Sequence, residues 1–163
     1  MTLTTAPNTE SNRALLIDNL RRYGIRFLAS GDPDGNHAEI YLSPEEIIVR
    51  LAQSADPRLR LALVPFFILH PQEAAKVNSL VDMLDEPAKT ELMMFYMAAV
   101  YLQRFWKTRL QLYLPEFPLL PDSYSHVLSL PKADDRHGKS GLYALAERHA
   151  NQSPYAFNRL ASY

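Results

Sequence analysis

The chain has 163 residues, of which 47% are hydrophobic and 21% are charged, a composition typical of one folded domain rather than of a disordered segment. A net charge of −1 argues against attraction of the whole molecule to nucleic acid or a membrane surface, although it is compatible with a local basic patch. The absence of cysteine excludes disulfides, thiolate metal sites and cysteine nucleophiles.

The first residues predict a leader followed by a helix. Residues 1–11 are polar and predict a flexible leader. Asn12 is suited to cap a helix over 13–23, in which apolar residues recur at helical spacing. Gly24 is expected to end this helix, as glycine commonly does after the last turn.

Residues 25–42 predict a small N-terminal β-hairpin. Short β-prone runs at both ends of this segment flank the turn-forming residues Ser30 to Asn36. A two-stranded hairpin is marginal alone, so we expect it to pack on the helices. The spacing of Asp32, Asp34 and Asn36 also resembles the start of a calcium loop, but the required glycine and glutamate do not follow, and a hairpin turn explains the same residues.

The segment 43–114 predicts a helical core. A capping serine, a first-turn proline and a capping-box glutamate stand together in the sequence SPEE that begins at Ser43. We expect four helices with short connections and therefore antiparallel neighbours, the second of them kinked at Pro65. Their expected starting points are Pro44, Pro57, Pro71 and Pro87.

The helix that begins near Pro87 is expected to run unbroken to Leu114 and to form the centre of the domain. It is apolar on nearly all sides, which is typical of a buried helix, and Trp106 and Tyr113 lie on its expected core face. Its longest apolar run, 92–102, is about half of the roughly 20 residues that a membrane span needs. The N-terminus also lacks a signal pattern, so we expect a cytoplasmic protein without membrane contact.

Residues 115–140 predict a long Pro-rich loop, anchored to the core by regularly spaced apolar side chains. A loop of this length in a compact domain suggests a function or a partner. C-terminal helices are expected over 141–163, the last beginning at Pro154 and still apolar at Tyr163, so that it either continues in the native product or packs on another surface. The predicted fold is mainly α: one compact helical domain over 12–163, built around one long central helix, with the small N-terminal β-hairpin.

No catalytic constellation is found in the sequence. Gly138-Lys139-Ser140, with Ala133 upstream, formally fits the loose phosphate-loop pattern. Two acidic residues would stand inside that phosphate cradle, however, and too few residues follow to complete a nucleotide-binding sheet. The five histidines show no metal-ligand spacing. We expect no enzymatic activity, no cofactor and no metal.

Basic and aromatic residues gather at the end of the expected long helix. Cations beside aromatic rings suit phosphate contact and base stacking, whereas cations near a helix C-terminus also complement the helix dipole, and both interpretations stay open. Together with basic groups after the Pro-rich loop they form one candidate binding patch. Its residues are Arg104, Trp106, Lys107, Arg109, Tyr124, Arg136, His137 and Lys139.

Three stretches carry a family resemblance: DPRL to HP over 56–71, AAVYLQ to TRL over 98–110, and GKSGLYALAE over 138–147. They resemble a group of small bacterial helical proteins associated with minimal nucleotidyltransferases in toxin–antitoxin-like pairs, and the likeness covers about 43–163. The resemblance implies a non-enzymatic protein-interaction partner, the neutralising, antitoxin-like member of a pair with a nucleotidyltransferase. It implies no catalytic residues.

Two other partners remain open on the residues alone. The basic and aromatic patch predicts, as an alternative, a nucleic-acid-binding module. The anchored loop and the apolar C-terminal helix are also compatible with self-association into a homo-oligomer.

Overall fold

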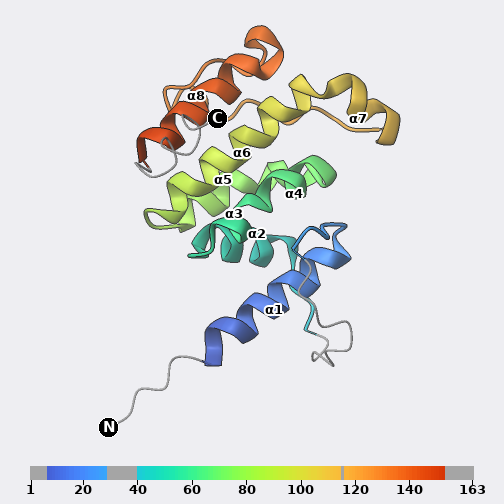
Figure 1. Ribbon diagram of the computed structural model, residues 1–163, viewed down its shortest axis with the longest axis vertical. Helices are drawn as coiled ribbons and strands as arrows, with labels where there is room; N and C mark the ends of the chain where they lie inside the picture. The colour runs from blue at the N-terminus through green and yellow to red at the C-terminus, as the bar shows by residue number, and fades with distance from the viewer. Residues whose placement is uncertain (1–6, 29–39, 115, 153–163) are drawn as a thin grey trace, which may run out of the picture.

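The computed structural model describes residues 7–28, 40–114 and 116–152, and this part of the chain consists of helices and loops (Figure 1). The helices are stacked along the long axis of the molecule, from α1 (Pro7–Arg22) at one end to α8 (Lys139–Gln152) at the other. The mainly helical class is as predicted. Among the described helices, none is long and apolar enough to cross a membrane.

The predicted β-hairpin is wrong, since the described residues contain no β-strand. α1 begins at Pro7, within the expected leader, and ends before Gly24, whose φ of 89° allows the chain to turn. The Ile25 N–H then donates to Leu20 O at 2.9 Å, as in a helix C-cap. The first expected strand is therefore part of the helix end.

The second expected strand is replaced by a contact with a helix side chain. Asn19 is buried in α1, where its Oδ1 accepts from the Leu42 N–H at 2.9 Å. Its Nδ2 donates to Ile40 O at 3.0 Å. Because this amide pairs with Ile40 O and with the Leu42 N–H, these two groups need no partner strand. Residues 29–39, with the calcium-like turn, lie outside the described residues, as do residues 1–6 of the expected leader.

The helix starts near Pro44, Pro57 and Pro71 are confirmed by α2 (Pro44–Gln53), α3 (Pro57–Leu61) and the 3₁₀ turn η1 (Pro71–Glu73), which leads into α5 (Ala74–Met83). At the first of these starts, the Ser43 and Glu46 side chains each accept the other residue's backbone N–H. A cap of this kind joins residues only a few positions apart, so its pattern can be recognised in the sequence.

The second predicted helix is divided at Ala62 rather than kinked at Pro65. α4 (Leu63–Leu69) begins directly after α3. Pro65 thus falls in the first turn of α4, where a helix does not need the backbone N–H that proline lacks.

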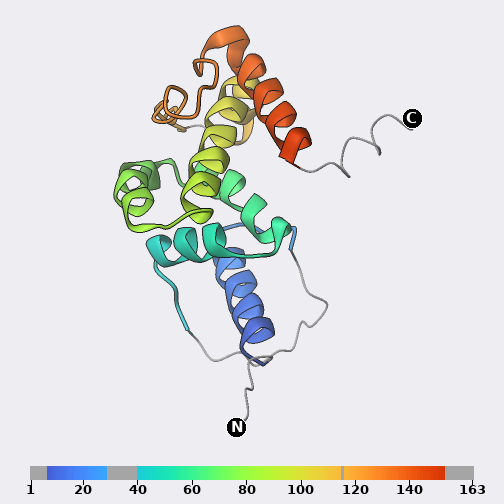
Figure 2. The ribbon, with the colours of Figure 1, turned by 90° about the vertical axis from the view of Figure 1, so that its left-hand side faces the viewer.

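The core is centred on α6 (Ala88–Phe105), which begins where Pro87 predicts. The ring of Phe67 in α4 meets the ring of Tyr96 edge-on at 5.2 Å. α8 runs alongside α6 (Figure 2), and a Cβ added at Gly141 of α8 would lie 2.1 Å from the Tyr101 ring. α6 is therefore in close contact with other elements along most of its length.

The predicted unbroken helix is wrong at Trp106. This residue has φ −98° and ψ 14°, and α7 (Lys107–Tyr113) follows it. Gln103 is the last buried residue of α6, and none in α7 is buried. No proline or glycine stands at the bend, which instead follows the point where packing on the core ends. Trp106 and Tyr113, expected in the core, are 38% and 81% exposed.

The C-terminal part contains a loop over 116–134, the 3₁₀ turn η2 (Asp135–Gly138) and α8, which begins two residues before the expected Gly141. Gly138 has a φ of 83°, and a Cβ there would lie 2.3 Å from Tyr101 O. This glycine is required by close approach to α6. The described residues directly before it, 116–137, contain no strand, so the structural context of a phosphate loop is missing. The helix predicted from Pro154 lies outside the described residues.

Candidate functional site

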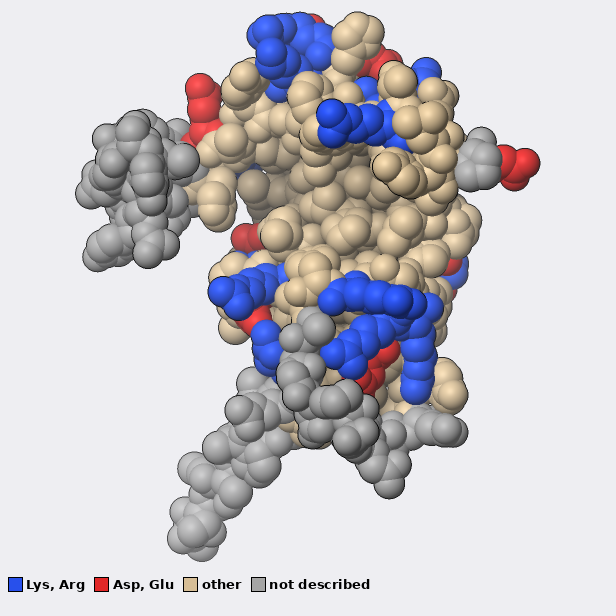
Figure 3. All heavy atoms as spheres, turned by 45° about the vertical axis from the view of Figure 1, so that its right-hand side comes forward, with Lys and Arg blue, Asp and Glu red and all other residues tan. Residues whose placement is uncertain are grey.

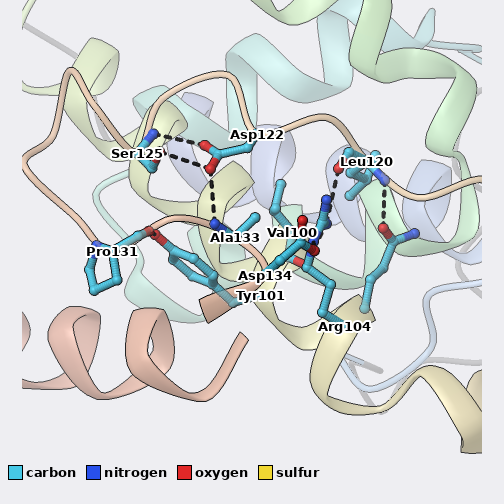
Figure 4. A network of polar contacts seen from close by, with 10 residues as sticks. Val100, Tyr101, Arg104, Leu120, Asp122, Ser125, Pro131, Ala133 and Asp134 are labelled. Carbon is cyan, nitrogen blue, oxygen red and sulfur yellow. Dashed lines mark hydrogen bonds and ion pairs between the residues drawn. The ribbon is translucent and has the colours of Figure 1, made fainter. Parts of the chain in front are cut away.

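A network of polar contacts joins α6 to the Pro-rich loop (Figure 4). The Tyr101 hydroxyl donates to Pro131 O at 2.6 Å, and the Tyr96 hydroxyl donates to Pro121 O at 2.8 Å. Gln103, fully buried, accepts from the Leu120 N–H at 2.7 Å. Polar side chains of the central helix therefore hold the loop backbone in place.

Arg104 belongs to this network rather than to a surface patch. Its Nε donates to Asp134 Oδ1 at 2.8 Å, and its Nη1 donates to Val100 O and Leu120 O at 3.1 and 3.0 Å. Its side chain is only 11% exposed. The guanidinium is thus occupied by the fold, which leaves it little capacity for an external ligand.

Asp122 closes the loop upon itself (Figure 4). Its carboxylate accepts from the Ser125 N–H and Oγ at 3.1 and 2.8 Å and from the Ala133 N–H at 2.9 Å. Partial burial raises the pKa of this carboxyl, but the hydrogen bonds from Ser125 and Ala133 outweigh it and leave the pKa below its usual value. The ionised form is the one that holds the loop.

The phenols in this region are also structural. Burial raises the pKa of Tyr101 to about 12, so the ring keeps its proton and donates to the loop. Tyr124, which the sequence placed in the candidate patch, is buried. Its hydroxyl donates to Asn78 Oδ1, and burial raises its pKa to about 12 as well. Each of these groups is directed at protein atoms.

In the part of the chain that the structure describes, no group of three or more histidine, aspartate or glutamate side chains is placed to hold a metal ion. The Asp122 and Arg104 cluster has its polar atoms satisfied by loop backbone and by Asp134. The network is suited to fixing a loop.

The remaining predicted residues are on the outside and form two groups. Arg136 and His137 are exposed in η2 with left-handed φ values of 50° and 56°, beside the exposed Asp134 and Asp135. The ammonium of Lys139 lies 5.8 Å from the centroid of the Tyr143 ring. This first group has mixed charge, which makes it a poor match for a polyanion.

The second group lies around α7 and is both apolar and basic. We call it the α7 surface and define it by six exposed residues: Phe105, Trp106, Lys107, Arg109, Leu112 and Tyr113. Leu112 and Tyr113 are 78% and 81% exposed. Large apolar side chains with this exposure, next to one another on one helix, indicate a contact surface.

The residues of the α7 surface keep a helical arrangement across the bend at Trp106. Hydrogen bonds from the Trp106 N–H to Leu102 O and from the Leu110 N–H to Trp106 O continue across the bend, at 2.8 and 2.9 Å. Helical register is thus approximately kept, and residues seven apart, such as Trp106 and Tyr113, share a face. The Arg109 guanidinium covers the Trp106 ring at 4.5 Å from its centroid.

The charge of the α7 surface is positive. Lys107 and Arg109 are its charged residues, and the sequence of α7, KTRLQLY, contains no acid. Figure 3 shows Lys and Arg side chains in two groups, near opposite ends of one face of the molecule, with a broad surface of uncharged residues between them. The α7 surface itself combines four exposed apolar or aromatic side chains with two cations.

Leu112 was not among the residues that the sequence singled out. Phe105 stood among the aromatic residues at the end of the expected long helix, but it was also expected to pack in the core. These two residues differ from the core residues of α6 because burial ends after Gln103. The point at which burial ends depends on the surrounding helices.

No protein-family model, no curated protein and no solved structure matches the chain.

Proposed function

We propose that the protein is a non-enzymatic interaction partner that docks another protein on the α7 surface. The observation that carries this proposal is the exposure of Leu112 and Tyr113 on a helix that has no buried residue. An exposed apolar helix face is stabilised when a partner removes it from water. Tyr, Trp and Arg are also the residue types that contribute most to binding at protein interfaces.

The partner is expected to present an apolar groove with carboxylates at its margin. The apolar part would receive Leu112 and Tyr113, and the carboxylates would meet Lys107 and Arg109. The resemblance to proteins paired with minimal nucleotidyltransferases supports a nucleotidyltransferase as this partner and a neutralising role for the chain. The loop fixed by Asp122 and Arg104 supports the same surface, because it holds the chain that follows α7 against the core.

Co-expression with the protein encoded by the neighbouring gene, followed by size-exclusion chromatography, tests this proposal. We expect the two proteins to elute together, and Leu112→Asp to separate them. Met83→Asp is the matched control, since Met83 is also a large apolar residue, 74% exposed, but lies at the end of α5. Two separately eluting proteins, or equal loss of the complex in both variants, would contradict the proposal.

A nucleic-acid-binding function is the second candidate, and one observation favours it. Arg109 over Trp106 is a cation–aromatic pair of the kind that contacts phosphates and bases. Binding through Lys107 and Arg109 would weaken with salt, with a logarithmic slope of about 0.7–0.9 per phosphate contact. A gel-shift titration at several salt concentrations decides the matter, and an absent or salt-independent shift rules this function out.

A further inference from the structure

A cavity of about 440 Å³ lies between α3, α6 and α8, and it shares no residue with the α7 surface. Its volume is within the range of small-molecule sites, roughly 300–1,000 Å³. Apolar side chains from all three helices line most of it. They are Leu61, Met94, Phe95, Ala98, Leu145 and Ala146.

One wall of this cavity contains an ion pair. Arg60 donates from Nη1 to Ser54 O at 2.7 Å, and its Nε lies 3.6 Å from Glu91 Oε2. This Nε is buried, so it is not open to a ligand in the cavity. Glu91 therefore offsets the charge of Arg60 within the fold.

The charges around the cavity favour an anion. Arg58 and Arg60 contribute two positive charges to the lining, and Glu91 contributes one negative charge. Arg58 is exposed, and although its charge acts on the nearby Asp56 carboxylate, no hydrogen bond or ion pair within 4 Å joins its guanidinium to another described residue. His149 of α8 lies at the same cavity. The exposed Arg58 guanidinium thus stands beside an apolar space.

We infer that this cavity binds a monocarboxylate with an unbranched apolar tail of medium length. The tail would fill the space lined by Phe95, Ala98 and Leu145, with Met94 adjusting to its shape. The carboxylate would lie at Arg58, because the planar guanidinium is suited to bind a carboxylate through two hydrogen bonds. The two arginines and Glu91 leave the lining with one net positive charge, which the single negative charge of the ligand balances.

Isothermal titration calorimetry with decanoate, below its micelle-forming concentration and at neutral pH, tests this site. We expect saturable binding with one site per chain, and weaker binding of decanol, which has the same tail without the charge. Absent binding, or equal affinity for decanoate and decanol, would overturn the inference.

Two variants locate the ligand. Ala146→Trp places a large ring at the cavity and is expected to abolish binding, whereas Glu147→Trp, at an exposed neighbour outside the cavity, leaves it unchanged. Arg58→Gln should weaken decanoate by about twofold to fivefold, as expected for an exposed ion pair, and leave decanol unchanged. Arg58 is exposed, so this variant is expected to fold.

A second copy of the chain is the competing occupant. Light scattering after size-exclusion chromatography distinguishes it from the ligand. A wild-type dimer that ignores decanoate and is separated into monomers by Ala146→Trp would show that the cavity is a contact between copies and would overturn the ligand site.

Discussion

α6 and α7 are consecutive in sequence and both rich in large apolar side chains, yet the fold treats them differently. In α6, Leu92, Tyr96 and Tyr101 are completely buried. In α7, Leu112 and Tyr113 are almost completely exposed, although they continue the same apolar pattern. Composition alone therefore does not distinguish a core helix from an exposed helix, whereas the position at which packing against neighbouring elements ends does.

The polar residues of the two helices differ in the same way. In α6, Tyr96, Tyr101 and Gln103 each hold a backbone group of the loop over 116–134. In α7, Arg109 contacts the ring of Trp106, within the same exposed surface. The polar side chains of α6 are used within the fold, whereas Arg109 and Trp106 remain exposed.

The largest effect is expected from truncating one tyrosine in each helix. Tyr96→Ala removes a fully buried ring and should lower the free energy of unfolding by about 3–5 kcal/mol. Tyr113→Ala, at an 81% exposed position, should change it by less than about 0.5 kcal/mol. Urea denaturation of both variants measures the difference. If Tyr96→Ala does not fold, Tyr96→Phe, which loses the hydrogen bond to Pro121 O, should still cost about 1 kcal/mol.

One glutamine in each helix provides a second comparison, with a smaller expected change in the free energy of unfolding and a more local effect. Gln103→Ala leaves the buried Leu120 N–H without its acceptor, at an expected cost of about 1–3 kcal/mol. Gln111→Ala on α7 is exposed and should be close to neutral. Hydrogen exchange of the loop amides adds a local measurement, and protection at Leu120 that survives in Gln103→Ala would contradict the role given to this side chain.

Alkaline pH should weaken the attachment of the loop. Burial raises the pKa of Tyr101 from 10.0 to about 12, so the folded state keeps a proton that the unfolded state has lost in this interval. The contribution to stability is complete below about pH 10 and declines as pH rises toward 12, by on the order of 1 kcal/mol per pH unit. Urea midpoints between pH 8 and 11.5 should fall in the wild type and fall less steeply in Tyr101→Phe. Equal slopes would show that this phenol does not titrate as described.

The smallest effect is expected at Arg109. Its contact with the Trp106 ring is exposed, so Arg109→Ala should reduce stability by no more than about 0.5–1 kcal/mol. Tryptophan fluorescence reports the contact directly, because Trp106 is the only tryptophan in the chain. A larger loss of stability would indicate that α7 is a structural part of the fold.

The elements that the sequence predicted are those determined by neighbouring residues. The capping box at Ser43 and Glu46 involves residues three apart, so its pattern is visible in the chain. The segment 40–42 was mispredicted as a strand because Ile40 O and the Leu42 N–H are bonded by Asn19, which lies outside that segment. Turn-forming residues predict a reversal of the chain equally well with or without strands.

The candidate site was only partly predictable for a similar reason. Residue types identified Trp106, Lys107 and Arg109, which lie together on the α7 surface, but they also selected Arg104 and Tyr124, which bind internal partners. Apolar residues such as Leu112 could not be assigned to the surface, since exposure depends on helices distant in sequence. The cavity between α3, α6 and α8 is likewise formed by residues far apart in the chain.

The central claim is that α6 holds the fold together whereas α7 is a docking surface. The double variant Leu112→Glu/Tyr113→Glu tests it most directly, measured for thermal unfolding and for co-elution with the protein encoded by the neighbouring gene. The expected result is an unfolding temperature close to that of the wild type, together with loss of the complex. A substantial fall in unfolding temperature, or a complex that persists, would contradict the claim.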